Sequence, residues 1–318
     1  MKETILKGGS LATTAIVDDG EKKFVRKKIS IAKEREYGYY RWYSQLKKMQ
    51  RLGRMYPGMF VKVIDFGYEE RHVRFRSHES YAYMDLEYHP DAVNCYEYLC
   101  EKRTDNEVIN LFNKIIWKLN MLHVVRIPSF SNSMNLYFQE EIINKLTDAT
   151  ATHMGFNHLL HEESNITHML KPMREKAIKL YVDPFESWTH GNVTLENILY
   201  LRDSDEVLFI DPYEENVIDN KLNEYSQLMQ SSNSHYELMV QHGDKFEVPE
   251  GIKNFNIVLK GHLNKHLTNT ERMLVKFFEA SQYYRMLPFK LKANRNIDAV
   301  RPFLETAERL TQEFLRAS

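Results

Sequence analysis

The sequence has few cysteines, no long apolar run and almost no net charge. Its two cysteines, Cys95 and Cys100, lie five positions apart in a segment expected to be helical, so they point in different directions and indicate neither a disulfide framework nor a metal site. No apolar run approaches the roughly 18 residues that span a bilayer. The first ten residues, MKETILKGGS, lack the apolar stretch of a signal peptide. We therefore expect a cytoplasmic protein without a membrane span.

The charge of the chain is balanced overall but not locally. A net charge of -1 gives no field that would draw the whole protein onto nucleic acid or a charged membrane. Residues 21–54 carry twelve Lys or Arg against three Glu, which fits the solvated side of a strand and helix and could also attract a polyphosphate. Aromatic-rich RNA-binding signatures are absent, so we expect no nucleic-acid partner.

Strand patterns dominate the first ninety residues. TILK and TTAIV flank the glycine-bearing GGSLA and predict a hairpin, and KKFVRKKIS follows the turn DDGE as a third strand. Residues 32–53 carry Tyr39, Tyr43 and Leu46 at helical spacing and predict a long helix that stops at Gly53. Two further strands are expected, over residues 58–69 and 79–88.

Helical patterns dominate after Pro90. The exception is ENILYLRDSDEVLFIDP, residues 196–212, which predicts two short strands joined by a polar turn. With 318 residues and 43% hydrophobic content, the chain can bury a sizeable core. We expect an α+β, bilobal fold: a small lobe of residues 1–88 with an antiparallel sheet and one helix, and a larger, mainly helical lobe of residues 89–318.

The segment THGNVTLENILY, residues 189–200, has the form of a phosphotransfer catalytic loop. Together with FIDPYEENVIDN, EYSQLMQSSNSHYEL and YYRMLPFK, it resembles the aminoglycoside and choline phosphotransferase branch of the protein-kinase-like superfamily. The narrower resemblance is to sugar-kinase-like phosphotransferases of bacterial polysaccharide synthesis. It implies ATP and Mg²⁺ as cofactors and a small-molecule acceptor, with a sugar as the first candidate.

Kinase chemistry needs a phosphate cover, a lysine and metal ligands. Backbone N–H groups of Gly8, Gly9 and Ser10 can approach phosphate oxygens because glycine has no side chain to block them, although a plain turn is the commoner reading of Gly-Gly. The strand period of two places Val25 and Lys27 on one face, where the first could cover adenine and the second reach phosphates. A slip of one residue would put Lys28 there instead.

The remaining nucleotide contacts follow from the resemblance. The expected partner of Lys27 is Glu36, which shares its side of the helix with Tyr39 and Tyr43. The strand YAYMDLEYHP resembles a kinase hinge, which implies adenine contacts from the backbone of Glu87 and His89 with Leu86 behind them. A literal DFG at residues 65–67 precedes this hinge and is interpreted as a chance match.

The metal ligands are expected at the ends of the predicted hairpin. Asn197 closes the loop, and Asp211 follows the apolar strand VLFI fourteen residues later, so the hairpin brings their oxygens together. Mg²⁺ prefers oxygen ligands and binds through few side chains plus phosphates. The alternative is an ordinary strand that ends in an Asp-Pro turn. His190 is interpreted as a scaffold residue of the catalytic loop.

Asn192 stands where such loops carry the aspartate that accepts the proton of the acceptor, and an amide cannot take a proton. Three explanations remain open: a substitution introduced to trap a complex, a naturally weakened or silent kinase, or an enzyme that uses another base. Glu196 and Asp183 are near in sequence, yet neither occupies the base position. We predict a small-molecule kinase with lowered or abolished activity, or alternatively a nucleotide-binding pseudokinase that regulates without chemistry.

Three other features allow both a functional and a purely structural interpretation. The histidines of residues 153–168 and the pair His262 and His266 could hold a metal, but histidines that line helices are commoner. Arg285 and Lys290 could meet an anionic acceptor, or simply form surface ion pairs. Glu224 and Gln227 stand where relatives tend to have Asp and Lys, which weakens any transfer of acceptor contacts from those relatives.

Overall fold

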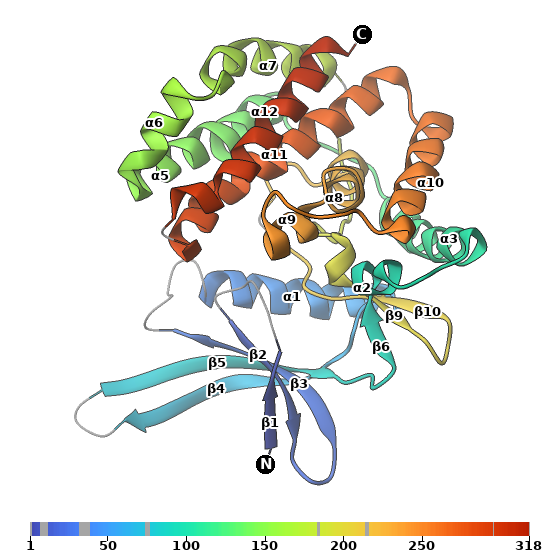
Figure 1. Cartoon of the computed structure of the whole chain (residues 1–318). Helices are drawn as coiled ribbons and strands as arrows, with labels where there is room; N and C mark the ends of the chain where they lie inside the picture. Colours follow the sequence, from blue (N-terminus) through green and yellow to red (C-terminus); the bar gives the residue numbers. More distant parts are fainter. Residues whose placement is uncertain are drawn as a thin grey trace. The chain divides into compact units, whose positions relative to one another are not determined.

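The structure is a computed structural model that describes residues 2–6, 12–31, 39–73, 77–182, 185–213, 216–294 and 296–317. It forms two compact units, drawn in Figure 1. The first unit combines residues 1–94 with 197–215, and the second combines 95–196 with 216–318. The first unit thus takes its residues from two separate stretches of chain, whereas the sequence suggested a single break after residue 88. That functional division stays a prediction.

The first unit is built on a five-stranded antiparallel sheet with the strand order β1-β2-β3-β5-β4. The strands are β1 (Lys2–Ile5), β2 (Thr13–Asp18), β3 (Lys23–Ser30), β4 (Val63–Val73) and β5 (Ser77–Glu87). Its helix is α1 (Tyr40–Met55), which packs on one face of the sheet. The predicted sheet with one helix is therefore confirmed.

The core of the first unit lies between this sheet face and α1. Ile29 of β3 packs with Trp42 and Leu46 of α1 in one buried cluster. The helix continues beyond Gly53, where the sequence suggested its end, because the buried Leu52 anchors its last turn and accepts the backbone N–H of Tyr56. A glycine inside a helix costs only about 1 kcal/mol, which such packing offsets.

A second, three-stranded sheet completes the first unit. The predicted hairpin is present as β9 (Ile198–Leu201) and β10 (Glu206–Phe209), and β9 also pairs with β6 (Ala92–Asn94). The backbone N–H of Phe209 donates to Met59 O (2.9 Å), and Phe209 O accepts from the N–H of Val61 (3.1 Å). These bonds fix the point at which the chain leaves β10 toward Asp211.

The second unit is mainly helical. Its helices are α2 (Cys95–Cys100), α3 (Asp105–Leu122), α4 (Ser133–Phe138), α5 (Asn144–Thr152), α6 (Met154–Glu162), α7 (Ile166–Leu180), α8 (Lys221–Ser232), α9 (Tyr236–His242), α10 (Glu250–His266), α11 (Asn269–Asn294) and α12 (Arg301–Arg316). Shorter elements are β7 (Ile127–Pro128), the π-helical turn η2 (Gln139–Ile143), β8 (Phe185–Glu186), and the 3₁₀ turns η3 (Leu195–Asn197) and η4 (Ile297–Ala299). Among the described residues, each helix is too short or too polar to cross a lipid bilayer.

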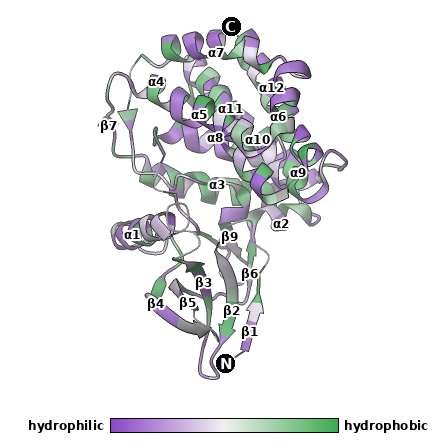
Figure 2. Cartoon of the chain, turned by 90° about the vertical axis from the view of Figure 1, so that its left-hand side faces the viewer, coloured by the Kyte–Doolittle hydropathy of each residue, from purple (hydrophilic) through white to green (hydrophobic). Residues whose placement is uncertain are grey.

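Helix α8 is unusual because it is both polar and buried. Figure 2 shows hydrophilic and hydrophobic residues intermixed along the helices of the second unit. In α8 every residue from Leu222 to Ser232 is buried. Its buried polar side chains are Asn223, Glu224, Ser226, Gln227, Gln230, Ser231 and Ser232. Buried polar groups are costly unless they form hydrogen bonds, so these side chains need partners inside the protein.

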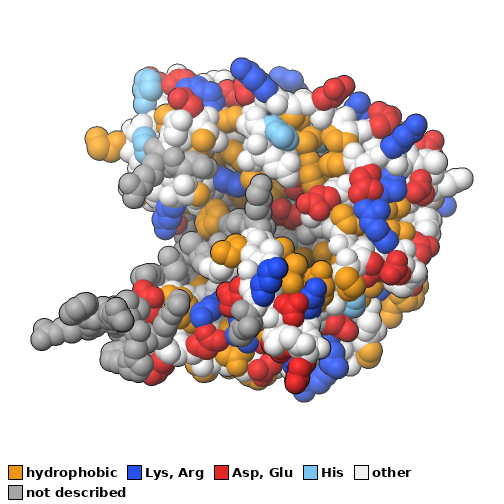
Figure 3. Space-filling model, turned by 60° about the horizontal axis from the view of Figure 1, so that its bottom comes forward, with side chains coloured by type: hydrophobic (Ala, Val, Ile, Leu, Met, Phe, Trp, Pro, Cys, Tyr) orange, Lys and Arg blue, Asp and Glu red, His pale blue; other side chains and the backbone are white. Residues whose placement is uncertain are grey.

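Charged side chains of both signs are mixed over the face of the molecule shown in Figure 3. Among the described side chains on this face, Lys and Arg lie among Asp and Glu without a continuous patch of one sign. This mixture agrees with the net charge of -1.

Candidate functional site

The buried ammonium of Lys27 is the centre of the candidate site in the first unit. Its Nζ lies 2.9 Å from Asp211 Oδ2 and donates to Gln45 Oε1 of α1, also at 2.9 Å. Lys27 is only 7% exposed and Gln45 only 6%. The neighbouring Lys28 pairs with Glu69 instead. One cation from β3, one amide from α1 and one carboxylate that follows β10 therefore meet inside a single unit.

Asp211 occupies a special backbone position. Its φ of 53° lies in the left-handed region, which non-glycine residues seldom adopt. Such conformations cluster at functional sites, where surrounding structure enforces them. The N–H of Ile210 donates to Asn197 O (3.0 Å), so Asn197 and Asp211 lie at the same end of the β9–β10 hairpin. The two predicted metal ligands are therefore neighbours across the end of the hairpin.

The predicted adenine contacts occupy neighbouring strands of the same sheet. Val25 of β3 is paired with Leu86 of β5, and both belong to the sheet face that α1 covers. The N–H of Glu87 is already bound to Lys62 O (2.9 Å), and His89 O accepts from the N–H of Ala92 (3.2 Å). Contacts of Glu87 and His89 with adenine remain predictions.

A cavity of about 940 Å³ also lies within the first unit. It is lined by α1, by the segment that leads into β4, and by the β9–β10 hairpin, with Glu87 and His89 among its lining residues. Lys27 and Asp211 are not among the described residues that line it. The cavity is therefore distinct from the Lys27 site.

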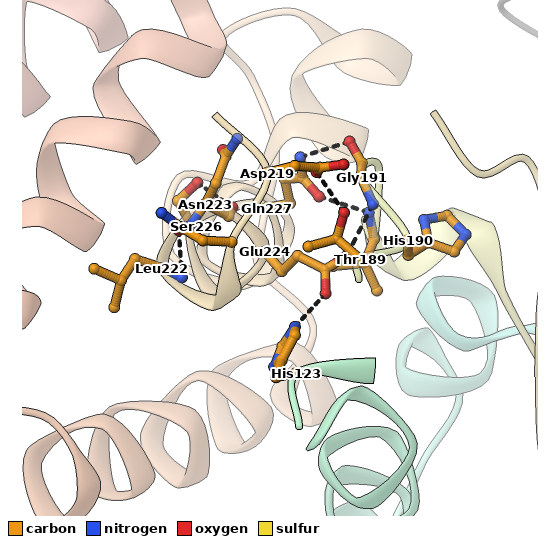
Figure 4. A network of polar contacts seen from close by, with 12 residues as sticks. His123, Thr189, His190, Gly191, Asp219, Leu222, Asn223, Glu224, Ser226 and Gln227 are labelled. Atoms are coloured by element: carbon orange, nitrogen blue, oxygen red, sulfur yellow. Dashed lines mark hydrogen bonds and ion pairs between the residues drawn. The ribbon is translucent and has the colours of Figure 1, made fainter. Parts of the chain in front are cut away.

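In the second unit, α8 holds the backbone of the predicted catalytic loop (Figure 4). The N–H of Gly191 donates to Glu224 Oε1 (2.8 Å), that of Val193 to Gln227 Oε1 (2.8 Å), and that of Leu195 to Ser231 Oγ (3.0 Å). We call these three contacts the α8 ladder.

The geometry of the α8 ladder follows from the helical period of α8. Residues 224, 227 and 231 are spaced i, i+3 and i+7, which places them on one face of the helix. The N–H groups of the alternate loop residues 191, 193 and 195 all point toward this face, as their three hydrogen bonds show. The ladder therefore satisfies both the buried side chains of α8 and the N–H groups of the loop.

Glu224 also makes a second contact, with His123 just beyond α3. Glu224 Oε2 lies 2.6 Å from His123 Nε2, and both side chains are almost fully buried. Burial alone would raise the pKa of Glu224, but the hydrogen bond and charge of His123, with smaller contributions from His190 and the Gly191 N–H, hold this pKa below its ordinary value. Glu224 is therefore charged, and it binds both His123 and the N–H of Gly191.

The residues that flank Asn192 are fixed on both sides. Gly191 has a φ of 85°, and its carbonyl accepts from Gln227 Nε2 and from Asn216 Nδ2, both at 2.9 Å. The N–H of Asn192 donates to Nδ1 of the fully buried His190 (3.1 Å). Main-chain contacts on both sides therefore hold residue 192.

Arg285 is linked to this loop rather than left open for an acceptor. It lies 2.9 Å from Glu141 Oε2 and donates to Asn216 Oδ1 (3.0 Å), the residue that bonds Gly191. Arg285 and Glu141 are both mostly buried. Its observed role is to connect η2 and α11 with the loop, which the sequence did not reveal.

A buried carboxyl lies under the end of the loop. Ser231 Oγ, which accepts from Leu195, donates to Glu237 Oε1 (2.6 Å). Burial, followed by the nearby charge of Glu196, raises the pKa of Glu237 to about 8.

Lys290 lies between two aromatic rings. Its ammonium is 5.2 Å from the ring centres of Tyr236 and Phe303. Burial lowers the pKa of Lys290, and the nearby charge of Glu196 partly offsets this lowering.

Four predicted site residues lie outside the described residues, Gly8, Gly9, Ser10 and Glu36, and so does Asp183, which the sequence did not place at the base position. The sequence did not single out Gln45 or His123. No group of three potential metal-binding His, Cys, Asp or Glu side chains occurs in the described parts of the chain. The rings of His262 and His266 are 4.4 Å apart, and His262 packs edge-on against Phe112, which fits the helix-lining interpretation.

Solved structures share this fold, although sequence comparison finds no matching protein-family model and no matching curated protein. Aminoglycoside phosphotransferase APH(4)-Ia is similar with a TM-score of 0.59 and 10% identity, over 100% of this chain and 94% of that chain. The Plasmodium vivax ethanolamine kinase has a TM-score of 0.55 and 13% identity, over 96% and 82%. A glucosamine kinase has a TM-score of 0.54 and 12% identity, over 98% and 80%. The expected protein-kinase-like α+β fold is confirmed, and it is the fold of small-molecule kinases.

Proposed function

We propose that the chain is an ATP- and Mg²⁺-dependent phosphotransferase that acts on a hydroxyl of a small molecule, with turnover lowered by Asn192. The observation that carries the proposal is the pair of Lys27 and Asp211, 184 residues apart in sequence and 2.9 Å apart in space. A buried lysine beside a carboxylate in a left-handed turn is unusual as a purely structural ion pair, because burying charges is costly. Phosphoryl transfer uses a lysine that holds phosphate oxygens and a carboxylate that holds the metal ion, and this pair would supply both.

The residues present fit the chemistry of the two cofactors. Lys27 would hold phosphate oxygens, and Asn197 and Asp211 offer the oxygen ligands that Mg²⁺ prefers. Bound Mg-ATP would supply the phosphoryl group and neutralise its charge. Support also comes from neighbours of the same fold: an APH(4)-Ia variant was solved with ADP and hygromycin B, and a glucosamine kinase with glucosamine, ADP and inorganic phosphate.

The lowered turnover follows from the amide at residue 192. Asn192 can orient an acceptor hydroxyl through hydrogen bonds but cannot accept its proton. General-base catalysis contributes typically about 10²–10⁴-fold in rate. Much of phosphoryl transfer is positioning, so slow turnover fits an intact loop. A sugar or polysaccharide precursor is the proposed acceptor class, in line with the sequence resemblance.

A second candidate function is a nucleotide-binding regulator without chemistry. Asn192 favours it, because the chain keeps the backbone geometry of the loop through the α8 ladder while lacking the base. The two candidates share the nucleotide site and differ in turnover alone.

One experiment separates these functions. ATP and Mg²⁺ binding is measured by calorimetry, and ATP turnover with a panel of amino sugars, sugars and amino alcohols is measured for the wild type, Asn192→Asp and the size-matched Asn192→Leu. We expect binding in all three and a gain of about 10²–10⁴-fold only in Asn192→Asp. Equal turnover in the wild type and Asn192→Leu would point to another base. Silence in all three, with binding intact, would favour the regulator, and absence of binding would refute both functions.

A further inference from the structure

The cavity of about 940 Å³ in the first unit has no part in the proposed phosphotransfer. Its floor consists of five buried apolar side chains: Met49, Phe60, Val61, Leu201 and Leu208. Ile64 and Phe66 extend the apolar surface outward and are 44% and 49% exposed. Small-molecule sites are typically concave, of about 300–1,000 Å³, and lined mainly by apolar side chains. The cavity has the size and lining of such a site.

One wall of the cavity is the segment that leads into β4, and hydrogen bonds of its main chain hold it in place. The N–H of Val61 donates to Phe209 O (3.1 Å), and the N–H of Phe209 donates to Met59 O (2.9 Å). Lys62 O accepts from the N–H of Glu87 (2.9 Å). Because these main-chain groups are already bonded, the wall presents side chains to the cavity and needs no rearrangement to receive a ligand.

Gly53 leaves open space in the wall that α1 contributes. A glycine inside a helix destabilises it relative to alanine. At Gly251 of α10 packing explains the glycine, because an added Cβ would collide with the carbonyl oxygen of Leu99. At Gly53 an added Cβ would meet no described atom within 4 Å, apart from its chain neighbours and the helix backbone around it. Its backbone is helical without a positive φ. Among the described residues nothing requires this glycine, whereas a ligand against α1 would use the space.

The charges around the cavity are mixed, and one of them is left for a ligand. Glu87 Oε2 lies 3.6 Å from His89 Nε2, and Nε of Arg54 donates to a carbonyl of its own helix (3.0 Å). Glu206 also has a contact within the chain. The exposed ammonium of Lys62 forms no ion pair or hydrogen bond with the described part of the chain. It is therefore the lining group that can bind an anion, through a charge-assisted hydrogen bond.

We propose that this cavity is a second ligand site, which takes an apolar organic anion such as an aromatic carboxylate. The apolar body lies against Gly53 and the apolar floor, and the anionic group meets Lys62. Lys27 and Asp211 are not among the described residues that line the cavity, so the inference does not depend on the proposed function.

Two fluorescent probes that differ in one charged group test this site. The anionic probe is 1-anilinonaphthalene-8-sulfonate, and the neutral probe is N-phenyl-1-naphthylamine, which has the same rings without the sulfonate. Dissociation constants and stoichiometry are measured by fluorescence titration of the full chain at neutral pH. The wild type is compared with Gly53→Leu, Gly261→Leu, Lys62→Met, Lys47→Met and Lys27→Met. Far-UV circular dichroism checks that each variant is folded.

The last four residues of this comparison divide into one test and three controls. Gly261 of α10 is matched to Gly53, because an added Cβ also meets no described atom within 4 Å there. Lys47 is matched to Lys62, because it is an exposed lysine of α1 that is not among the described lining residues. Lys27→Met shows whether a probe enters the candidate nucleotide site instead.

In the wild type we expect one saturable site per chain, with the anionic probe bound about tenfold more tightly than the neutral one. Gly53→Leu should weaken both probes by about tenfold or more, because its side chain fills the space of the ligand. Lys62→Met should weaken the anionic probe by about tenfold and leave the neutral probe unchanged. The three controls should behave as the wild type. Should Gly53→Leu not fold, Gly53→Ala should weaken both probes by roughly threefold.

Four results would overturn the inference. The first is the absence of saturable binding of both probes, and the second is equal affinity of the wild type for the two. The third is a loss of binding in Gly261→Leu or Lys47→Met as large as in its matched variant, which would show a general effect. The fourth is a loss in Lys27→Met, which would place the probe at the candidate nucleotide site. None of these results bears on Mg-ATP binding, so the proposed function stands or falls separately.

Discussion

The Lys27 site of the first unit and the loop of the second unit are held in opposite ways. Lys27 meets Asp211 through one ion pair, and Asp211 is still 34% exposed at its side chain. The loop is held along its main chain by the α8 ladder, whose side chains are fully buried. A ligand can reach the partly exposed Asp211 and exchange with this ion pair, but nothing in solution reaches the ladder. One region is therefore suited to respond to ligands, and the other to stay unchanged.

Removal of Glu224 should have the largest effect on stability. Glu224→Ala leaves His123 and the Gly191 N–H buried without this partner, and breaking a buried pair from one side costs about 3–5 kcal/mol. Glu224→Gln, which keeps the shape, should cost less. The free energy of unfolding is measured in denaturant. Glu313→Ala, at an exposed i,i+4 pair with Arg309, serves as the control and should change stability by less than about 0.5 kcal/mol. A small effect at Glu224 would show that the loop is held by other contacts.

The second prediction concerns pH. Because the pKa of Glu237 is raised to about 8 in the folded chain from 4.5, the folded state binds an extra proton between these values. Its contribution to stability is complete below about pH 4.5 and is lost as pH rises through 8. Glu237→Gln mimics the neutral acid and should be more stable than the wild type by roughly 1–3 kcal/mol at pH 8.5, with little difference at pH 4.5. Parallel pH profiles of the two proteins, obtained by denaturant unfolding, would contradict the neutral state of Glu237.

Gln227 is a neutral member of the α8 ladder that makes two hydrogen bonds to the loop. Gln227→Ala removes two hydrogen bonds with the backbone of the loop, at Val193 and Gly191, and should cost about 1–3 kcal/mol. The matched control is Gln230→Ala on the same helix, since Gln230 is also buried but its amide donates to the sulfur of Met286 rather than to the loop. Hydrogen exchange of the Val193 amide should quicken in the first variant alone. Equal costs for both variants would mean that packing, not the ladder, explains the loss.

Lys27→Met should have the smallest effect on stability. The partly exposed Asp211 can be hydrated once its partner is gone, so we expect a cost below about 1 kcal/mol together with loss of nucleotide binding. If Lys27→Met costs as much stability as Glu224→Ala, the Lys27–Asp211 pair is as firmly built into the fold as the α8 ladder, and the contrast between them fails. Thermal unfolding and calorimetry with Mg-ATP give the two quantities.

Local patterns predicted the fold well. Strand periodicity located β2 and β3, helical spacing located α1, and the polar turn between apolar runs located the β9–β10 hairpin. These signals depend on neighbours in sequence, so a single sequence contains them. The end of α1 was less clear, because burial of Leu52 outweighs the weak helix propensity of Gly53.

The candidate site was predictable only in part. Lys27, Asn197 and Asp211 follow from motif and strand period, and their roles stay predictions. Gln45 and His123 were not foreseen, because their partners lie 18 and 101 residues away and neither residue belongs to a motif. Arg285 stood out in a motif, but its pairing with Glu141 depends on how η2 packs against α11.

The α8 ladder contacts only main-chain N–H groups of the loop. Since none of its three contacts is made to the side chain of residue 192, a substitution there leaves the hydrogen bonds of the ladder in place. Saturation mutagenesis at position 192 would therefore vary the chemistry of the loop above an unchanged ladder, and differences in turnover would report on the side chain itself.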